Sequence, residues 1–340
     1  MKKKKIKNPL IRRIPRELLG DWKKYLVVAL FLILTIGFVS GMYVANESML
    51  VAADEGVTKY KLEDGHFELD KKADETLLSA IETGTKADVK KYYLDKAKKE
   101  LDEKLDEKAY PEAYDKAWDK IVEEMDDKYA DAEEKYELND SDFTEVPVKV
   151  YENFFRNEEE DYNNDGEAEG NIRVYAKNDN VDLACLLDGA FPEKADEIAI
   201  DRMHADNVGV KVGDEISVSG QRFKVVGLIA YVNYATLHEK STDMMFDAIK
   251  FDVAMVTQEG FNSLHKTVHY AYTWNYVDTP ADEVEQKAKS DDFMKALLTQ
   301  VVCADIELED YMPRYANPAI NFATDDMGSD KAMGGVLLDI

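Results

Sequence analysis

Residues 197–229 read "EIAIDRMHADNVGVKVGDEISVSGQRFKVVGLI", and this stretch decides the fold of the larger part of the chain. Residues 198–200 are a short apolar run, which is typical of a strand. A helical turn follows and is expected to end near Gly209, because glycine readily takes the left-handed conformation that closes a helix. Gly213 and Asp214 then turn the chain into a predicted β-hairpin.

The hairpin is expected to bury one face. Its apolar side chains alternate with polar ones along both arms and return to the same side: Ile216, Val218, Phe223 and Val225. Gly220-Gln221 fits a two-residue type II′ turn between the arms, because glycine leads the pair. Gly227 follows in the second arm.

Strand-like and helical stretches alternate over the rest of the region that begins at Phe143. Runs rich in Val, Tyr and Phe predict strands: 146–155, 171–177, 215–234, 251–257 and 267–277. Residues 281–301 have helical character and lie after these strands. Interleaving of this kind predicts a mixed α/β domain.

Residues 86–138 differ from their surroundings, because more than half of them are charged and none is glycine. Two apolar stripes at helical spacing run through them: Leu94, Ala97, Leu101 and Leu105, then Tyr114, Trp118, Ile121, Met125, Tyr129, Ala132 and Tyr136. Pro111 begins a helix well and is excluded from a helix interior, so it marks the bend between them. We expect an antiparallel, coiled-coil-like helical hairpin, inserted in the domain, whose charges form a solvated face; binding of an extracytoplasmic partner at its tip is the alternative.

Residues 25–45 contain no charged side chain. A helix of that length reaches about 31 Å, which is enough to cross the hydrocarbon core of a membrane. Secretory signal sequences have a shorter apolar region and a small-residue cleavage site, whereas this run ends with Met42-Tyr43-Val44-Ala45. The sequence therefore predicts a retained transmembrane helix.

The charges on the two sides of this span differ in sign. Residues 1–24 carry ten basic and two acidic side chains, and the chain after the span carries 33 basic and 68 acidic ones. Because basic flanks stay in the cytoplasm, the N-terminus is predicted inside and the main domain outside the cell membrane. So acidic a chain is not expected to bind nucleic acid. The segment before the span is either a short interfacial helix on the membrane lipid or a continuation of the span.

Two patterns suggest metal ligands. Asp161, Asn163, Asp165 and Gly166 match the start of a calcium loop, but the twelfth position is Ile172 instead of a bidentate glutamate, so an acidic turn is the favoured interpretation. His265 and His269 would share one face of a strand, although no zinc-protease glutamate lies between them.

No motif predicts catalysis or a cofactor. The sequence has no nucleophile-elbow serine, no P-loop and no glycine-rich dinucleotide turn, and His66, His204 and His238 are isolated. Cys185 and Cys303 permit one disulfide at most, and two buried thiols are the favoured interpretation.

The 209–227 pattern resembles the outer core domain of FtsX/MacB-type ABC transporter permeases. The residues that carry it are Gly209, Gly213, Asp214, Ile216, Val218, Gly220, Phe223, Val225, Val226 and Gly227. The basic start, the single span and the large outer domain are similar to that family as well. These residues are structural in the resemblance, which implies no active site.

The resemblance implies a permease subunit whose ATPase is a separate cytoplasmic chain and which works with a second permease copy or half. Such permeases convert the ATP-driven closure of a dimer into motion of the outer domain. Residues 46–328 would be that domain, interrupted by the hairpin at 86–138, and residues 329–340 would begin a second span, so the chain is expected to be part of a longer or split permease. A bacterial, Gram-positive surface is the favoured location.

Two other classes remain open at this stage. A single-pass surface binding or sensor protein would use the helical hairpin for recognition. An anchored hydrolase or metalloprotein would use the acidic loop or the histidine pair.

Overall fold

The computed structural model describes residues 22–136, 143–234, 237–239, 245 and 247–304. Residues 22–55 belong to one compact unit, and the described residues from Gly56 onward belong to another. The basic segment before Trp22 and the expected start of a second span lie outside the described residues.

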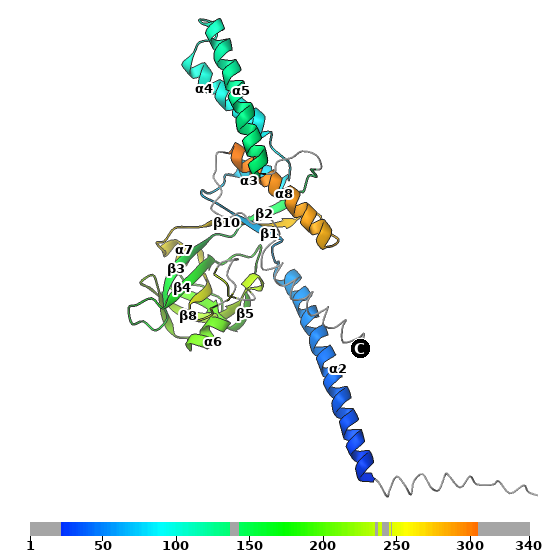
Figure 1. Ribbon diagram of the computed structural model, residues 1–340. Coiled ribbons are helices and arrows are strands. Elements are labelled where there is room, and N and C mark those ends of the chain that lie inside the picture. The colour runs from blue at the N-terminus through cyan, green and yellow to red at the C-terminus, as the bar shows by residue number, and fades with distance from the viewer. Residues whose placement is uncertain (1–21, 137–142, 235–236, 240–244, 246, 305–340) are drawn as a thin grey trace, which may run out of the picture. The chain divides into compact units, whose positions relative to one another are not determined.

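Helix α2 (Trp22–Lys59) contains the apolar run (Figure 1). Its part from Trp22 to Val44 is long and apolar enough to cross a membrane, and none of that part is buried inside the protein. Large side chains such as Phe31, Leu34 and Phe38 are mostly exposed, as expected for a helix whose natural surroundings are lipid. By length and composition, this helix agrees with the predicted span.

A three-stranded antiparallel sheet with strand order β1-β10-β2 forms one core of the second unit. Its strands and the helices packed against it are β1 (Gly65–Leu69), β2 (Val148–Glu152), β10 (Tyr270–Tyr276), α3 (Glu75–Glu82) and α8 (Glu283–Cys303). Trp274 and Phe67 are fully buried between sheet and helices, and the Trp274 ring lies 4.7 Å from that of Phe293 on α8.

A seven-stranded mixed sheet forms the other core, with strand order β5-β8-β6-β9-β4-β3-β7. Its strands are β3 (Phe155–Asp161), β4 (Gly170–Ala176), β5 (Cys185–Gly189), β6 (Glu197–Asp201), β7 (Glu215–Val218), β8 (Gln221–Ala230) and β9 (Phe251–Val256). Since β7 pairs with both β3 and β8, six of these strands close into a ring, and β5 is added to β8 outside it.

Two buried clusters lie against this sheet. One gathers apolar side chains from the ring strands with the short helices α6 (Arg202–Val208) and α7 (Gln258–Ser263). The other gathers Tyr175, Ile229 and Tyr231 with Phe251 and Met255. Every residue of β6 and β9 is buried, including the acidic residues Glu197, Asp201 and Asp252. The mixed α/β prediction for the outer domain is confirmed.

Three strands were not expected from the sequence: β1, β3 and β5. The predicted run ended at Phe155, where β3 begins, because the next residues read "RNEEED". Glu158 and Glu160 are nevertheless fully buried on this strand. A half-buried strand is recognised by apolar side chains that alternate with polar ones and point inward. Here the inward positions hold carboxylates, so the strand could not be recognised.

Helices α4 (Val89–Lys104) and α5 (Pro111–Tyr136) lie side by side (Figure 1). Lys90 Nζ lies 2.6 Å from Asp126 Oδ1, and the Tyr114 hydroxyl donates to Asp102 Oδ1 over 2.5 Å. Lys90, near the start of α4, contacts Asp126 late in α5, and Asp102, near the end of α4, contacts Tyr114 early in α5. The two helices are therefore antiparallel. The described residues of both predicted stripes are buried or half-buried, Leu101 and Tyr114 most of all.

The segment around Gly84, before α4, lies next to the segment around Val146, which leads into β2. The Val146 N–H donates to the Gly84 carbonyl over 3.4 Å, and both segments are bonded to α8. The Ala87 N–H donates to Thr299 Oγ1, and the Thr144 N–H donates to Asp292 Oδ2.

Candidate functional site

The segment that the sequence singled out forms β6, α6, β7 and β8 in succession. The Asp201 side chain accepts the Met203 and His204 N–H groups and so begins α6. Gly209, at φ 84°, ends that helix in the left-handed conformation. The predicted strand and the predicted helix end near Gly209 are confirmed.

The turn of the β7–β8 hairpin differs from the prediction. Val218 pairs with Gln221, so the two turn residues are Ser219 and Gly220, at φ 48° and 82°. Both positive angles are those of a type I′ turn, so the expected Gly220-Gln221 type II′ turn is wrong. Ser219 tolerates this conformation because its hydroxyl donates to Glu158 Oε2 and its N–H to the Glu159 carbonyl.

The remaining motif residues hold the hairpin in place. Gly213, at φ 104°, donates its N–H to the Val225 carbonyl, and Asp214 Oδ2 accepts the Lys211 N–H. Phe223 lies opposite Ile216 in the buried face. Gly227 lies on β8 opposite Gly189 of β5.

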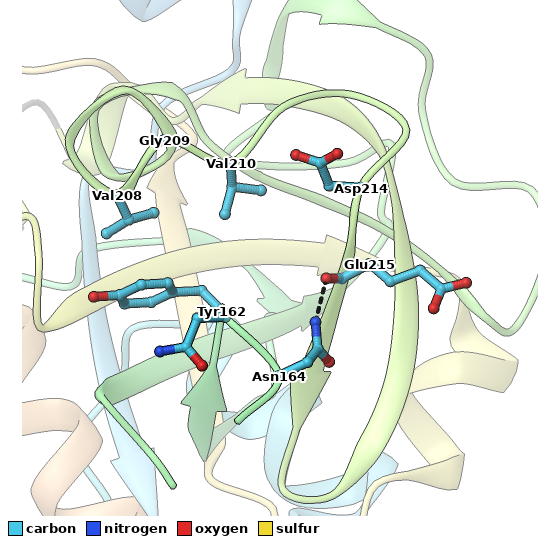
Figure 2. Close-up of a pocket in the computed structure, with 8 residues that line it drawn as sticks. Tyr162, Asn164, Val208, Gly209, Val210, Asp214 and Glu215 are labelled. Atoms are coloured by element: carbon cyan, nitrogen blue, oxygen red, sulfur yellow. Dashed lines mark hydrogen bonds between the residues drawn. The ribbon is translucent and has the colours of Figure 1, made fainter. Parts of the chain in front are cut away.

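A surface groove of about 510 Å³ lies beside this hairpin (Figure 2). Its lining residues come from the acidic turn and from the stretch around Gly209: Tyr162, Asn163, Asn164, Val208, Gly209, Val210, Asp214 and Glu215. Val208 and the Tyr162 ring lie at one end, and Asp214 and Glu215 at the other. Asn164 Nδ2 donates to the Glu215 carbonyl over 2.7 Å and joins the two sides.

The lining of this groove combines apolar side chains with polar and acidic ones. Its apolar valines and the Asp214 carboxylate would favour a small ligand with an apolar part and a positive charge.

The predicted calcium loop is an acidic turn closed by its own side chains. Asp165 donates its N–H to Asp161 Oδ1 and Asn163 Oδ1, and Gly166 donates to Asp161 Oδ2. Glu169 was missed by the sequence analysis, yet its carboxylate joins those of Asp161 and Asp165, with the three ligand atoms within 4.8 Å of one another. Ile172, at the expected twelfth position, is buried on β4.

We expect calcium to leave the unfolding midpoint of the full chain within about 1 °C of its metal-free value, because both Asp161 oxygens already accept backbone N–H groups. Differential scanning fluorimetry of the detergent-solubilised chain, with calcium or with chelator, measures this. A rise of several degrees that Asp161→Asn removes and Asp214→Asn keeps would establish the calcium site instead.

The two histidines of the proposed pair do not share a strand. His269 forms a bridge with Phe155, its ring stacks on the Phe155 ring at 4.6 Å, and its Nδ1 lies 3.4 Å from Glu68 Oε2. His265 is exposed in the segment between α7 and β10. The expectation that both histidines share one face of a strand is therefore wrong, because β10 begins only at Tyr270.

Cys185 and Cys303 are each half-buried and are not joined by a disulfide. The Tyr60 hydroxyl donates to Cys185 Sγ over 2.9 Å.

A buried polar network that no sequence motif predicted lies where the chain enters β1. Asp182 accepts the Glu63 N–H through Oδ1 and the Asn153 side-chain amide through Oδ2, both over 3.0 Å. His66 Nδ1 lies 3.0 Å from Glu63 Oε1. Burial raises the pKa of Glu63 to about 8 and that of Asp182 well above its usual value, and burial lowers the pKa of His66.

His204 is not isolated, in contrast to the sequence-based expectation. It lies in the core of the ring sheet with Glu160 and Asp252, and the three side chains are fully buried. Burial lowers the pKa of His204, but the Asp252 and Glu160 carboxylates outweigh it and raise this pKa to about 9. Sequence spacing could not reveal the group, because its members come from β3, α6 and β9.

No protein-family model matches this sequence, and no curated protein matches it. Two solved structures are similar to the chain. The extracellular domain of the noncanonic ABC-type transporter YknZ from Gram-positive bacteria is 14% identical, over 52% of this chain and 88% of that one, with a TM-score of 0.28. The periplasmic region of MacB from Actinobacillus actinomycetemcomitans is 10% identical, over 57% of this chain and 81% of that one, with a TM-score of 0.29. We argue function from the chain's own residues.

Proposed function

We propose that the chain is the N-terminal portion of a permease subunit of an FtsX/MacB-type ABC transporter. In this proposal a separate cytoplasmic ATPase drives movement of the extracytoplasmic domain through the transmembrane helix. The supporting observation is that the residues directly after α2 are hydrogen-bonded to the folded core.

The connection after α2 uses backbone and side-chain bonds. Leu62 donates its N–H to the Val57 carbonyl and closes the helix end. The Asp182 and Leu183 N–H groups donate to the carbonyls of Lys61 and Tyr60, over 3.0 and 2.8 Å. These bonds attach the helix end to the segment that enters β5.

A second set of bonds attaches the same connection to the three-stranded sheet. The Asp64 N–H donates to the Trp274 carbonyl, and Asp64 Oδ2 accepts the Tyr276 N–H, both over 2.9 Å. A displacement of the helix end would therefore reach both sheets, which is the property that a mechanical transmission requires.

The partners of this proposal are a cytoplasmic ABC ATPase, a second permease copy or half, and membrane lipid. We propose that the basic segment at residues 1–24 contacts the ATPase. The N-terminally tagged full chain can be purified from its native membrane after mild cross-linking. We expect a protein with a P-loop to co-purify with it. Charge reversal at Arg12, Arg13 and Arg16 should weaken that association, with Lys71→Glu on the outer domain as control.

Recovery of the chain without any P-loop protein, together with a stop codon directly after codon 340, would overturn the permease proposal. That result would favour a single-pass surface binding or sensor protein, for which the groove of Figure 2 would be the ligand site. Further hydrophobic spans encoded in frame after codon 340 would support the permease.

We expect the N-terminus to lie in the cytoplasm and the domain after α2 to lie outside, because basic flanks resist translocation. In a bacterial host, alkaline phosphatase fused after Ala304 should be active, and the same reporter fused after Met1 should be inactive. Activity of the second fusion alone would mean the opposite orientation. Replacing Lys23 and Lys24 by glutamine, as a graded control, should raise the second activity without abolishing the first.

We further propose that α4 and α5 form a hairpin inserted in the domain. Support comes from the Val146–Gly84 hydrogen bond, which closes the core independently of the residues between. Thr299 and Asp292, which hold the two ends, are seven residues apart on α8, or about 10 Å.

Replacement of residues 89–141 by a six-residue Gly/Ser linker is therefore expected to leave the rest of the domain folded, with an unfolding midpoint lowered by less than about 5 °C. Circular dichroism should show a loss of helix alone. As a control, removal of residues 75–82 (α3), whose Leu77 and Ile81 are in the sheet core, should unfold it. Equal damage by the two deletions would contradict the insertion.

A further inference from the structure

Three ionisable side chains meet inside the ring sheet: Glu160 of β3, His204 of α6 and Asp252 of β9. Each is fully buried, and one ligand atom from each lies within 4.8 Å of the others. His204 Nε2 is 3.2 Å from Glu160 Oε2. Three elements that are distant in sequence thus direct a metal-binding type of side chain to one point.

The surroundings fix the direction in which each group points. His204 Nδ1 donates to the Ala248 carbonyl over 2.8 Å, so Nε2 is the nitrogen that faces the two carboxylates. Asp252 Oδ1 accepts the Val253 and Asp201 N–H groups over 2.7 and 3.1 Å. A backbone carbonyl on the far nitrogen is the usual second contact of a metal-bound imidazole, because it fixes the tautomer and the ring plane.

Apart from the ion pair between His204 Nε2 and Glu160 Oε2, the atoms that face one another have no hydrogen-bond partner within the described part of the chain. They are both carboxylate oxygens of Glu160, His204 Nε2 and Asp252 Oδ2. Buried polar atoms in native proteins are nearly always satisfied, so four such atoms around one point indicate a group that completes them. The separate acidic cluster at Asp161 differs, since it is partly exposed and its oxygens accept backbone N–H groups.

The ligand set suits a divalent cation. Two carboxylates and one imidazole are the side chains that bind such a cation in proteins, and buried ionisable groups are normally paired or bound to a metal.

We propose that Glu160, His204 and Asp252 form a structural site for a divalent transition metal, Zn²⁺ or Mn²⁺. Nitrogen and carboxylate ligands bind Zn²⁺ at about 2.0–2.2 Å, which places neighbouring ligand atoms about 3.4 Å apart in a tetrahedral site. The 3.2 Å separation of His204 Nε2 from Glu160 Oε2 already matches, and a carboxylate oxygen of Asp252 lies within 4.8 Å of both residues' ligand atoms.

The site would strengthen the wall of the groove. The metal would join β3, α6 and β9, and α6 supplies Val208 at the groove edge. The Tyr162 ring, which also lines the groove, lies edge-on to the His204 ring at 6.0 Å and covers the site from that side. Because all three ligands are fully buried, the site is structural and not catalytic, and it holds whether or not the chain is a permease subunit.

Metal analysis of the full chain in detergent tests the proposal. After treatment with 1,10-phenanthroline and EDTA, the protein should take up about one equivalent of Zn²⁺ or Mn²⁺, with a rise of at least about 5 °C in its unfolding midpoint. Co²⁺ in the same site should give visible absorption typical of nitrogen and oxygen ligands in a tetrahedral arrangement. His204→Gln and Asp252→Asn should lose the uptake, whereas Asp161→Asn with Asp165→Asn should keep it.

Two results would overturn the site. The first is a metal content below one tenth of an equivalent in wild-type protein, with no change of midpoint on addition of Zn²⁺, Mn²⁺ or Co²⁺; this readout does not depend on the folding of any variant. The second is an uptake that survives His204→Gln and disappears in the Asp161/Asp165 variant, which would assign the metal to the acidic turn.

Discussion

Replacement of Gly227 by alanine is expected to cost more than about 3 kcal/mol of unfolding free energy, whereas the same change at Gly220 is expected to cost about 1 kcal/mol. A Cβ atom at Gly227 would lie 2.3 Å from the Ala190 carbonyl oxygen and 3.1 Å from its carbon. That contact is with backbone, so it is relieved only if β5 and β8 separate.

Strands β5 and β8 can approach so closely because each has a glycine at the point of contact. Gly227 pairs with Gly189, and a Cβ at Gly189 would lie 2.2 Å from the Val226 carbonyl oxygen. The Ala190 N–H donates to that same carbonyl over 2.9 Å and holds the approach. Gly220 differs, because nothing lies within 4 Å of its added Cβ and only its positive φ of 82° opposes a side chain.

Urea unfolding of the detergent-solubilised chain, followed by tryptophan fluorescence and circular dichroism, measures both variants. Gly37→Ala, in the apolar helix with open space around it, is the matched control and should have no effect on the domain. Equal and small losses at Gly227 and Gly220 would mean that the strands do not approach each other as described.

The second large effect concerns pH and Glu63. In the folded protein burial raises the pKa of this carboxyl to about 8, from an ordinary value of 4.5. The folded protein therefore retains a proton that the unfolded chain releases, so stability is greatest below about pH 4.5 and falls as the pH rises to about 8. Burial raises the pKa of Asp182 in the same direction.

Glu63→Gln keeps a neutral side chain of similar size and removes this proton. We expect the variant to exceed the wild type by about 1–3 kcal/mol at pH 8 and to differ little from it at pH 4.5. Because burial lowers the pKa of His66, this histidine contributes a dependence of opposite sign, and its contribution changes with Glu63 because His66 Nδ1 lies 3.0 Å from Glu63 Oε1.

Urea unfolding at several pH values between 4.5 and 9 provides the measurement. Glu259→Gln, at an exposed position in the first turn of α7, is the control and should follow the wild type throughout. A Glu63→Gln curve parallel to that of the wild type would mean that Glu63 is ionised in the folded protein.

Local chemistry explains which parts of the fold were predictable. The β6–α6–β7–β8 segment was found because its strand period, helix end and turn glycines are all encoded within about thirty neighbouring residues. The apolar stripes of α4 and α5 were found for the same reason. The type I′ turn was missed because Ser219 takes a positive φ with help from Glu158, which is distant in sequence.

The candidate sites were predicted less well, for a reason that concerns distance along the chain. Glu160, His204 and Asp252 each look solvent-exposed or incidental in sequence, and only the pairing of β3 and β9 with β4 brings two of them into one core. The acidic turn was visible, but Glu169 was overlooked since a calcium-loop template directed attention to Ile172. A sequence motif can reveal a site whose residues lie close together along the chain. A site whose residues come from several elements can be found only once the sheet topology is known.

The closed ring also limits which strands of this sheet can form backbone hydrogen bonds with a strand of another chain. Among the described strands of the ring sheet, each of the six that close the ring has a neighbour on both sides, and β5 has a neighbour only in β8. That one open edge is five residues long and interrupted by a bulge between Leu186 and Asp188. Short, kinked edges resist the addition of a foreign strand. The ring sheet is thus protected against edge-to-edge aggregation.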